Sequence, residues 1–293
     1  MLSPQTSNRD PLAVALRRKA EAGVPGSSEE RILAAGDGWR VVDIVCTCGP
    51  RDRPFEERPR TTSISLVLSG TFAYRSDSGT SLLSAGSWFL VNGEQTFECS
   101  HQHGEGDRCL SFQFEPELFE RLARDAGASR ARFAHHRLPP LRQLAPLTAR
   151  AEAAVVQHDS FEEIALELTG AVIPVARETR AEVSATNGDP GRIAPVLRHL
   201  ESDFNAPHSL SELARSAGLS PYHFLRIFKG VTGITPHQWL LRARLREAAQ
   251  LLVTTSDAVT DIALDVGFED LSNFIRSFRA EFGVSPRQYR AIA

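Results

Sequence analysis

An internal repeat in the C-terminal part of the chain constrains the fold more than any other feature. Leu213 to Trp239 aligns with Ile262 to Tyr289 at two fixed offsets. Ala214 and Gly218 recur 49 positions later, and six further residues recur 50 positions later, namely Phe224, Arg226, Phe228, Gly233, Pro236 and Gln238. The second copy therefore carries one inserted residue in its turn, and both copies should fold as the same unit.

Each copy has the pattern of a helix, a tight turn and a second helix. In the first copy, apolar residues from Leu210 to Ala217 have the spacing of one helical face. Gly218 follows, where a residue in the left-handed conformation would end the helix. Ser220 and Pro221 then suit the N-cap and first position of another helix, as Asp270 does in the second copy. This pattern is typical of a unit that places a recognition helix in the DNA major groove.

A long helix is expected between the two copies, from Thr235 to Leu252. Its apolar residues lie on one broad side, and Pro236 falls in its first turn. Such a helix is roughly 27 Å long, comparable to the roughly 34 Å between successive major-groove faces on one side of DNA. One chain would therefore set both recognition helices on the same side of a duplex.

The stretch from Asp261 to Arg290, with the preceding Leu210 to Leu252, resembles the AraC/XylS family of bacterial transcription regulators. The resemblance covers about a third of the chain. It implies a helical module, which we expect at residues 192–293, that binds double-stranded promoter DNA, usually as a dimer. It also implies a sensing domain elsewhere in the chain and, for an activator, contact with RNA polymerase.

The residues that face away from the phenylalanines of each second helix are the candidate DNA contacts. Arginine suits a bidentate contact with guanine and asparagine one with adenine, whereas Lys229 and Arg279 are expected at phosphates. The alternative is that these exposed side chains only solvate the surface. The candidates for reading bases are Tyr222, His223, Arg226, Ser272, Asn273 and Arg276.

Length and charge agree with a regulator of two domains. The chain has 293 residues and a net charge of -3, but from Pro190 onward it contains 12 basic and 10 acidic residues, against 21 and 26 in the rest. DNA binding should therefore weaken with salt. No stretch approaches about 18 consecutive apolar residues, and the first residues lack an apolar signal core, so we expect a cytoplasmic protein.

Before the repeat, the sequence predicts a β-barrel. Residues 1–37 are expected to form an N-terminal arm with a short helix from Asp10 to Ala22. Residues 38–138 contain short runs rich in Val, Ile, Thr, Phe and Tyr between turn residues, which indicates a jelly-roll type of antiparallel barrel. This region resembles the cupin-like sensing barrel of AraC-type regulators and is expected to sense a small molecule or metal. The histidines of a cupin enzyme site are missing from Glu57 to Ile64.

Two further helices are expected at residues 139–179, each with an apolar stripe. The stripes either pack within the domain or form a homodimer interface. Residues 180–191 are polar and predict a linker. The expected fold class is α+β: a cupin-like β-barrel and a helical pair, followed by an all-α domain in which a long helix joins two helix-turn-helix units.

The barrel region contains a concentration of cysteine and histidine. On a strand, residues two apart share a face, as Cys46 and Cys48 do. The candidate metal ligands are Cys46, Cys48, Cys99 and Cys109, with His101 and His103 as alternatives. They indicate zinc or another soft metal, a redox pair, or small buried cysteines beside solvated histidines.

The same residues are compatible with a second function. The adaptive-response alkylation-repair protein carries an AraC-type module beside a zinc-bound cysteine that accepts a methyl group. The present chain would then be a DNA-tethered methyl-transfer enzyme. The β-rich context and the absence of a C-x2-C spacing favour the regulator, and the sequence contains no pattern typical of a hydrolase or kinase.

Overall fold

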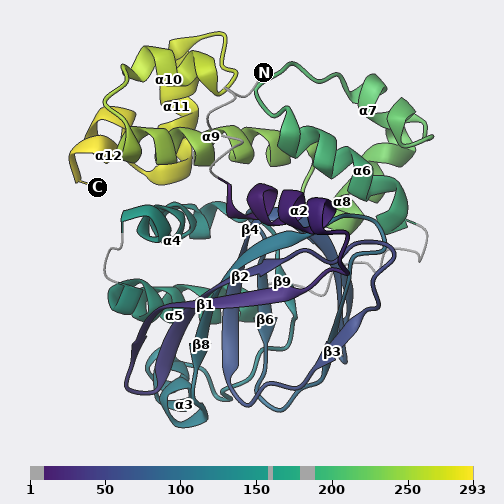
Figure 1. Ribbon diagram of the computed structural model, residues 1–293. Coiled ribbons are helices and arrows are strands. Elements are labelled where there is room, and N and C mark those ends of the chain that lie inside the picture. Colours follow the sequence, from purple (N-terminus) through teal and green to yellow (C-terminus); the bar gives the residue numbers. More distant parts are fainter. Residues whose placement is uncertain (1–9, 158–160, 179–188, 293) are drawn as a thin grey trace.

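The computed structural model describes residues 10–157, 161–178 and 189–292 and consists of a β-sheet N-terminal part and a helical C-terminal part (Figure 1). Strands are connected antiparallel in the order β1-β2-β8-β4-β6-β9, with β5, β7 and β3 joined through β4 and β7. The strands among these residues are β1 (Ser28–Gly36), β2 (Trp39–Cys46), β3 (Phe55–Glu57), β4 (Thr62–Ser76), β5 (Gly79–Ser84), β6 (Trp88–Val91), β7 (Phe97–Ser100), β8 (Asp107–Phe114) and β9 (Arg137–Leu138).

Strand β4 is long enough to belong to two sheets. Its first half pairs with β6 and β8, and its second half pairs with β5 and β7. The register shifts between Val67 and Ser69, and Gly70 next to this bulge has a φ of 82°. A Cβ at Gly70 would lie 2.4 Å from the Gly106 carbonyl oxygen, so only glycine fits there. The bend lets one strand close a barrel around a central pocket.

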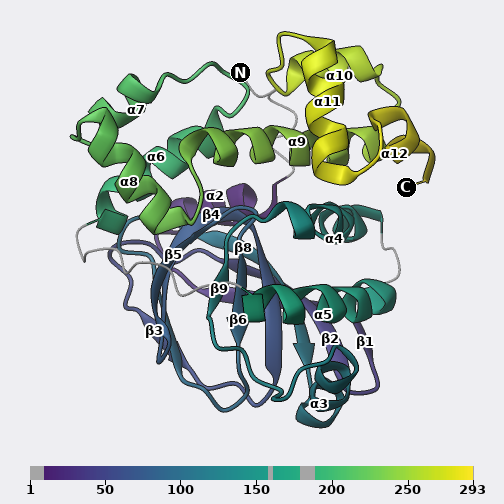
Figure 2. The ribbon, with the colours of Figure 1, turned by 180° about the vertical axis from the view of Figure 1, so that it is seen from behind.

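In the sheet that contains β2, β8, β4 and β6, side-chain alternation gives each strand two different faces. On β8, Leu110, Phe112 and Phe114 are buried against the outer helices, whereas the residues between them line the pocket. These helices lie along the side of the barrel (Figures 1 and 2). They are α3 (Pro116–Asp125), the short 3-10 helix η1 (Arg142–Leu144), α4 (Ala145–Gln157) and α5 (Phe161–Glu178), whereas α2 (Pro11–Ala22) packs against β2 and β8.

The C-terminal helices agree with the expected repeat. Gly218 and Gly267 have φ values of 66° and 89° and follow the first helix of each copy, which confirms the predicted left-handed stops. Ser220 and Asp270 cap the second helices, also as predicted. The helices are α6 (Asp189–Ser202), α7 (Leu210–Ser216), α8 (Pro221–Thr232), α9 (Pro236–Thr254), α10 (Val259–Asp265), α11 (Leu271–Phe282) and α12 (Pro286–Ile292).

Some expectations differ from the structure. The sheet begins at Ser28 rather than near residue 38, because the mostly exposed β1 lacks the apolar pattern that marks a strand. Of the two alternatives for the apolar stripes of α4 and α5, packing within the chain is the one observed, and Leu168 and Val172 are fully buried in its core. Of the expected linker, residues 180–188 lie outside the described residues, and α6 already begins at Asp189. No helix of the described ranges is long and apolar enough to cross a membrane.

The helical part lies across one end of the barrel (Figure 2). Leu82 of β5 joins the apolar cluster of α6, α7, α8 and α9, and Ala149 of α4 joins that of α9 to α12. The Trp239 indole N–H donates to Ser84 Oγ at 3.3 Å, and Arg246 of α9 pairs with Glu152 of α4 at 3.1 Å. Apolar contact and ion pairing therefore join the two parts.

We expect Glu152 to make stability depend on pH. Burial raises its pKa to about 7, although Arg246 opposes this shift and Glu247 adds to it. An acid whose folded pKa lies above its unfolded value loses its contribution to stability as pH rises through the folded pKa. Between pH 5 and 8 the free energy of unfolding of the wild type should fall relative to that of Glu152→Gln by about 2 to 3 kcal/mol. Denaturant melts at several pH values measure it, and a constant difference would contradict the assignment.

Candidate functional site

Helix α8 presents a polar face to solvent because its apolar residues are buried in the core. Phe224 and Phe228 are fully buried, whereas Tyr222 is 74% exposed. The Ser220 side chain accepts a hydrogen bond from the His223 backbone and so fixes the first turn. His223, Arg226 and Lys229 are also exposed. All four candidate contacts of the first repeat therefore lie where DNA has access to them.

Helix α11 repeats this arrangement. Asp270 caps it by accepting hydrogen bonds from the backbone N–H groups of Ser272 and Asn273 at 3.1 and 2.9 Å. Phe274 and Phe278 are fully buried, and the four candidate contacts Ser272, Asn273, Arg276 and Arg279 are exposed. Arg276 donates to Asn273 Oδ1 at 3.1 Å, so these two side chains are already held side by side. A shallow surface depression lies beside Ser272, Arg276 and Arg279.

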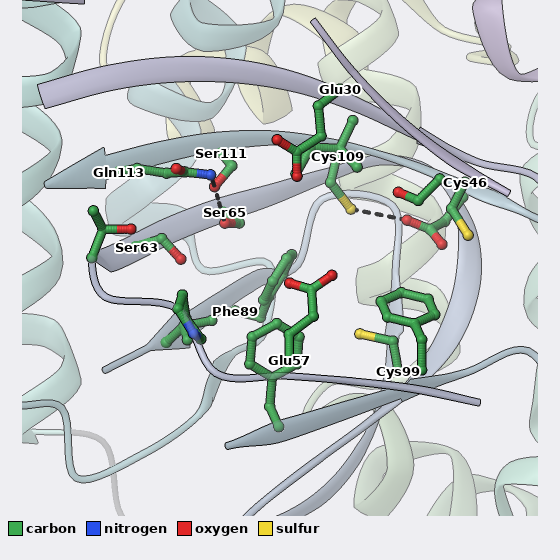
Figure 3. A pocket seen from close by; sticks show the side chains of 18 of the residues that line it. Glu30, Cys46, Glu57, Ser63, Ser65, Phe89, Cys99, Cys109, Ser111 and Gln113 are labelled. Atoms are coloured by element: carbon green, nitrogen blue, oxygen red, sulfur yellow. Dashed lines mark hydrogen bonds between the residues drawn. The ribbon is translucent and has the colours of Figure 1, made fainter. Parts of the chain in front are cut away.

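The barrel encloses a pocket of about 400 Å³. Figure 3 shows the carboxylates of Glu30 and Glu57 pointing into it from opposite sides. Partial desolvation and the charge of Glu30 raise the pKa of Glu57, although the residue as a whole is exposed at the pocket's edge. Hydroxyl groups gather on one wall, where Ser65 donates to Ser111 at 2.9 Å. The pocket thus combines apolar walls with acidic and hydroxyl groups, which suits a small polar molecule.

The structure divides the predicted metal ligands into two groups. Cys46, Cys48 and His101 offer ligand atoms within 4.8 Å of one another, all buried. Cys99 and Cys109 line the pocket (Figure 3) but are not members of this group. Cys109 Sγ instead donates to Asp107 Oδ2 at 3.1 Å. The His103 ring lies close to Gly191 of α6.

All four thiols are sheltered from solvent. The exposed fractions are 2% for Cys46, 8% for Cys48, 7% for Cys99 and 3% for Cys109. Burial raises the pKa of Cys46, Cys99 and Cys109 above the ordinary range. A methyl group on DNA has no access to such a thiol without opening of the barrel, which disfavours the methyl-transfer alternative.

Sequence reasoning missed the residues that hold the helical part against the barrel. Arg137 of β9 is buried and donates to the carbonyl oxygens of Leu82 and Val231, and so ties the end of α8 to the sheet. Burial lowers the pKa of Arg137 to about 10, so it stays protonated at neutral pH. Glu201 of α6 accepts from the Gly70 backbone at 2.9 Å. These contacts join residues far apart in sequence, and no local pattern marks them.

We predict that Arg137→Met loosens the contact between α8 and the barrel. Methionine keeps much of the length but leaves two buried carbonyl oxygens without this donor, so the free energy of unfolding should fall by about 2 to 4 kcal/mol. Amide exchange at the C-terminal end of α8 should become faster. Arg142→Met, at an exposed residue of η1, is the matched control. Equal behaviour of the two variants would contradict the role of Arg137.

Two family models match separate parts of the chain. One, described as a helix-turn-helix domain, matches residues 213–292. The other, described as the regulatory protein PchR N-terminal domain, matches residues 42–158. The first match covers both repeats, and the second covers most of the barrel with α3, η1 and α4.

Several known proteins resemble part of the chain. The HTH-type transcriptional activator RhaS of Klebsiella pneumoniae (strain 342) is 34% identical over 151 residues, which cover 51% of this chain and 54% of that protein. The HTH-type transcriptional activator AarP of Providencia stuartii is 34% identical over 98 residues, 33% of this chain and 73% of AarP. The solved DNA-binding domain of AdpA, in complex with a target DNA, is 32% identical and covers 34% of this chain and 91% of its own, with a TM-score of 0.34. The chain spans about half the length of RhaS from Klebsiella pneumoniae (strain 342) and from Enterobacter sp. (strain 638).

Proposed function

This chain belongs to the AraC/XylS family of transcription regulators, and we propose that it binds specific sequences in double-stranded promoter DNA and controls transcription according to an effector held in its barrel. The observation that carries this proposal is the exposure of the same polar and basic positions on α8 and α11. A surface helix made only for packing has no reason to repeat this set on two copies.

In this proposal α7–α8 and α10–α11 act as two helix-turn-helix units. Helix α9 has 19 residues, which corresponds to about 28 Å and suits units that enter neighbouring stretches of one major groove. Arg226 and Arg276 then read guanine, and Asn273 reads adenine. Tyr222, His223 and Ser272 contact bases or sugars beside them, and Lys229 and Arg279 hold phosphates.

The cupin-like barrel is the effector domain in this scheme. Its pocket is enclosed by strands, and β4, β5 and β9 contact α6 and α8 directly. An effector with unequal affinity for two arrangements of this contact shifts their populations and with them the display of α8. We further propose that the protein acts in the cytoplasm as a homodimer on paired half-sites and contacts RNA polymerase if it is an activator.

We expect Arg226→Ala and Arg276→Ala each to weaken specific DNA binding by about 1 to 3 kcal/mol, because each removes a bidentate base contact. Fluorescence anisotropy with a duplex selected from a random-sequence pool measures this loss. Arg121→Ala, at an exposed residue of α3, is the control and should leave affinity unchanged. Wild-type affinity in both test variants would remove the proposed base contacts.

Lys229→Ala and Arg279→Ala are expected to act differently. Loss of a phosphate contact weakens binding to every sequence alike and reduces by about 1 the slope of log affinity against log salt concentration. Titrations of selected and scrambled duplexes at several salt concentrations separate the two classes of contact. A sequence-dependent loss with an unchanged slope would instead assign these residues to bases.

A further inference from the structure

Two cysteines and one histidine from distant parts of the chain meet where the barrel touches α6. Cys46, Cys48 and His101 each place a ligand atom within 4.8 Å of the other two. We propose that this cluster binds a thiophilic metal ion, Zn²⁺ or Cu⁺, and that its occupancy is passed to α6 through residues 101–106, the loop between β7 and β8. The second half of this proposal rests on the proposed function, whereas the first does not.

The ligand types and spacing suit such an ion. Cysteine sulfur and histidine nitrogen are the usual ligands of Zn²⁺, and thiolates also select Cu⁺. Around one Zn²⁺ ion, bond lengths of about 2.0 to 2.3 Å place tetrahedral ligand atoms roughly 3.3 to 3.8 Å apart. Small side-chain rotations therefore bring the three atoms from their present separations to bonding positions. Cys46 also lines the pocket, so an ion bound to its sulfur borders the effector cavity.

Asp107 positions the histidine of this cluster. Its Oδ1 atom lies 2.6 Å from His101 Nε2, and both side chains are buried. A histidine that donates one N–H to a carboxylate keeps the lone pair of its other nitrogen for a metal, as in many zinc sites. We therefore assign His101 Nδ1 to the ion and Asp107 to orienting the ring.

The segment that carries the cysteines is held in place by other residues. The Cys48 carbonyl oxygen accepts from Gly106 N at 2.8 Å, which ties it to the histidine loop. Lys19 of α2 donates to the Thr47 carbonyl oxygen at 2.7 Å. Asp52 accepts from Gly49 N at 2.8 Å. The backbone around both sulfurs is thus fixed without help from a metal.

The same loop contacts the helical part. Arg198 of α6 donates to the His103 carbonyl oxygen. Gly104 is packed so closely that a Cβ would lie 2.8 Å from Thr71 Oγ1 and 3.3 Å from Arg198 Nη1. A metal that fixes His101 therefore acts two residues away from a contact with α6, and α6 packs against α8 in one apolar cluster.

Metal titration of the full chain tests the site. The protein is purified under reducing conditions, freed of metal with a chelator, and titrated with Zn²⁺ against a chromophoric competitor, and with Cu⁺ in a parallel series. We expect one ion per chain, with at least about tenfold weaker affinity in Cys46→Ser, Cys48→Ser and His101→Gln. Replacement by Co²⁺ should give a sulfur-to-metal charge-transfer band that both serine variants weaken.

Cys99→Ser is the matched control, because Cys99 is as buried as Cys48 but lies outside the cluster. It should bind metal like the wild type, and circular dichroism melts check that every variant is folded. Three outcomes would each overturn the site. They are an equal loss of metal affinity in Cys99→Ser, no stoichiometric metal binding by the wild type, or a Cys46–Cys48 disulfide in place of bound metal.

DNA affinity tests the coupling separately. The metal-loaded protein, with Zn²⁺, and the metal-free protein, with chelator, should bind a duplex selected by the wild type with affinities that differ at least about fivefold. Arg198→Ala should keep metal affinity but lose most of this difference. Equal DNA affinity of the two forms would overturn the coupling and leave the metal site standing. Metal binding without any DNA binding would instead remove the proposed function.

Discussion

Helix α9 is the element on which the arrangement of the helical part depends. Trp239 near its start belongs to the apolar cluster of α6, α7 and α8, and Leu252 near its end belongs to that of α10, α11 and α12. Between them, Arg244 donates to the carbonyl oxygens of Phe204, Ala206 and Gly267, each at 2.8 Å. One guanidinium thus joins the segment after α6 to the turn of the second repeat. Because these carbonyl groups have a charged donor, their partial burial costs little.

The barrel obeys a different constraint, the two-residue period of its strands. Ile64 and Leu66 of β4 face the outer helices, and Ser63 and Ser65 face the pocket. The outer face has to be apolar because it packs against α3, α4 and α5. The inner face lines the pocket, so its side chains can be polar. Acidic and hydroxyl groups therefore line a cavity whose outer wall is made of fully buried apolar side chains.

The sequence predicted most of the helical part and less of the barrel. Gly218, Ser220 and Phe224, with their counterparts, act through local backbone and packing rules, so their roles could be predicted, and the AraC/XylS membership they indicated is confirmed. Strand β1 was missed because its side chains are mostly exposed. Contacts such as Arg137 with Val231 depend on how distant elements meet, which no local pattern encodes. Cys46 and Cys48 lie close together as expected, but Cys48 follows the end of β2, so strand parity is not the reason. Pairing them with His101 required the turn after β7, where strand alternation no longer applies.

The sharing of β4 between two sheets has an evolutionary consequence. Its bend at Gly70 leaves no room for a side chain, and its register is set by four neighbouring strands, so the backbone around the cavity tolerates little change. Inward-facing side chains such as Ser63, Ser111 and Gln113 line the cavity and take no part in the backbone pairing that sets this register. If the pocket holds an effector as proposed, descendants of this chain could change the bound molecule by exchanging those side chains one at a time, while the scaffold and its contacts with α6 are inherited unchanged.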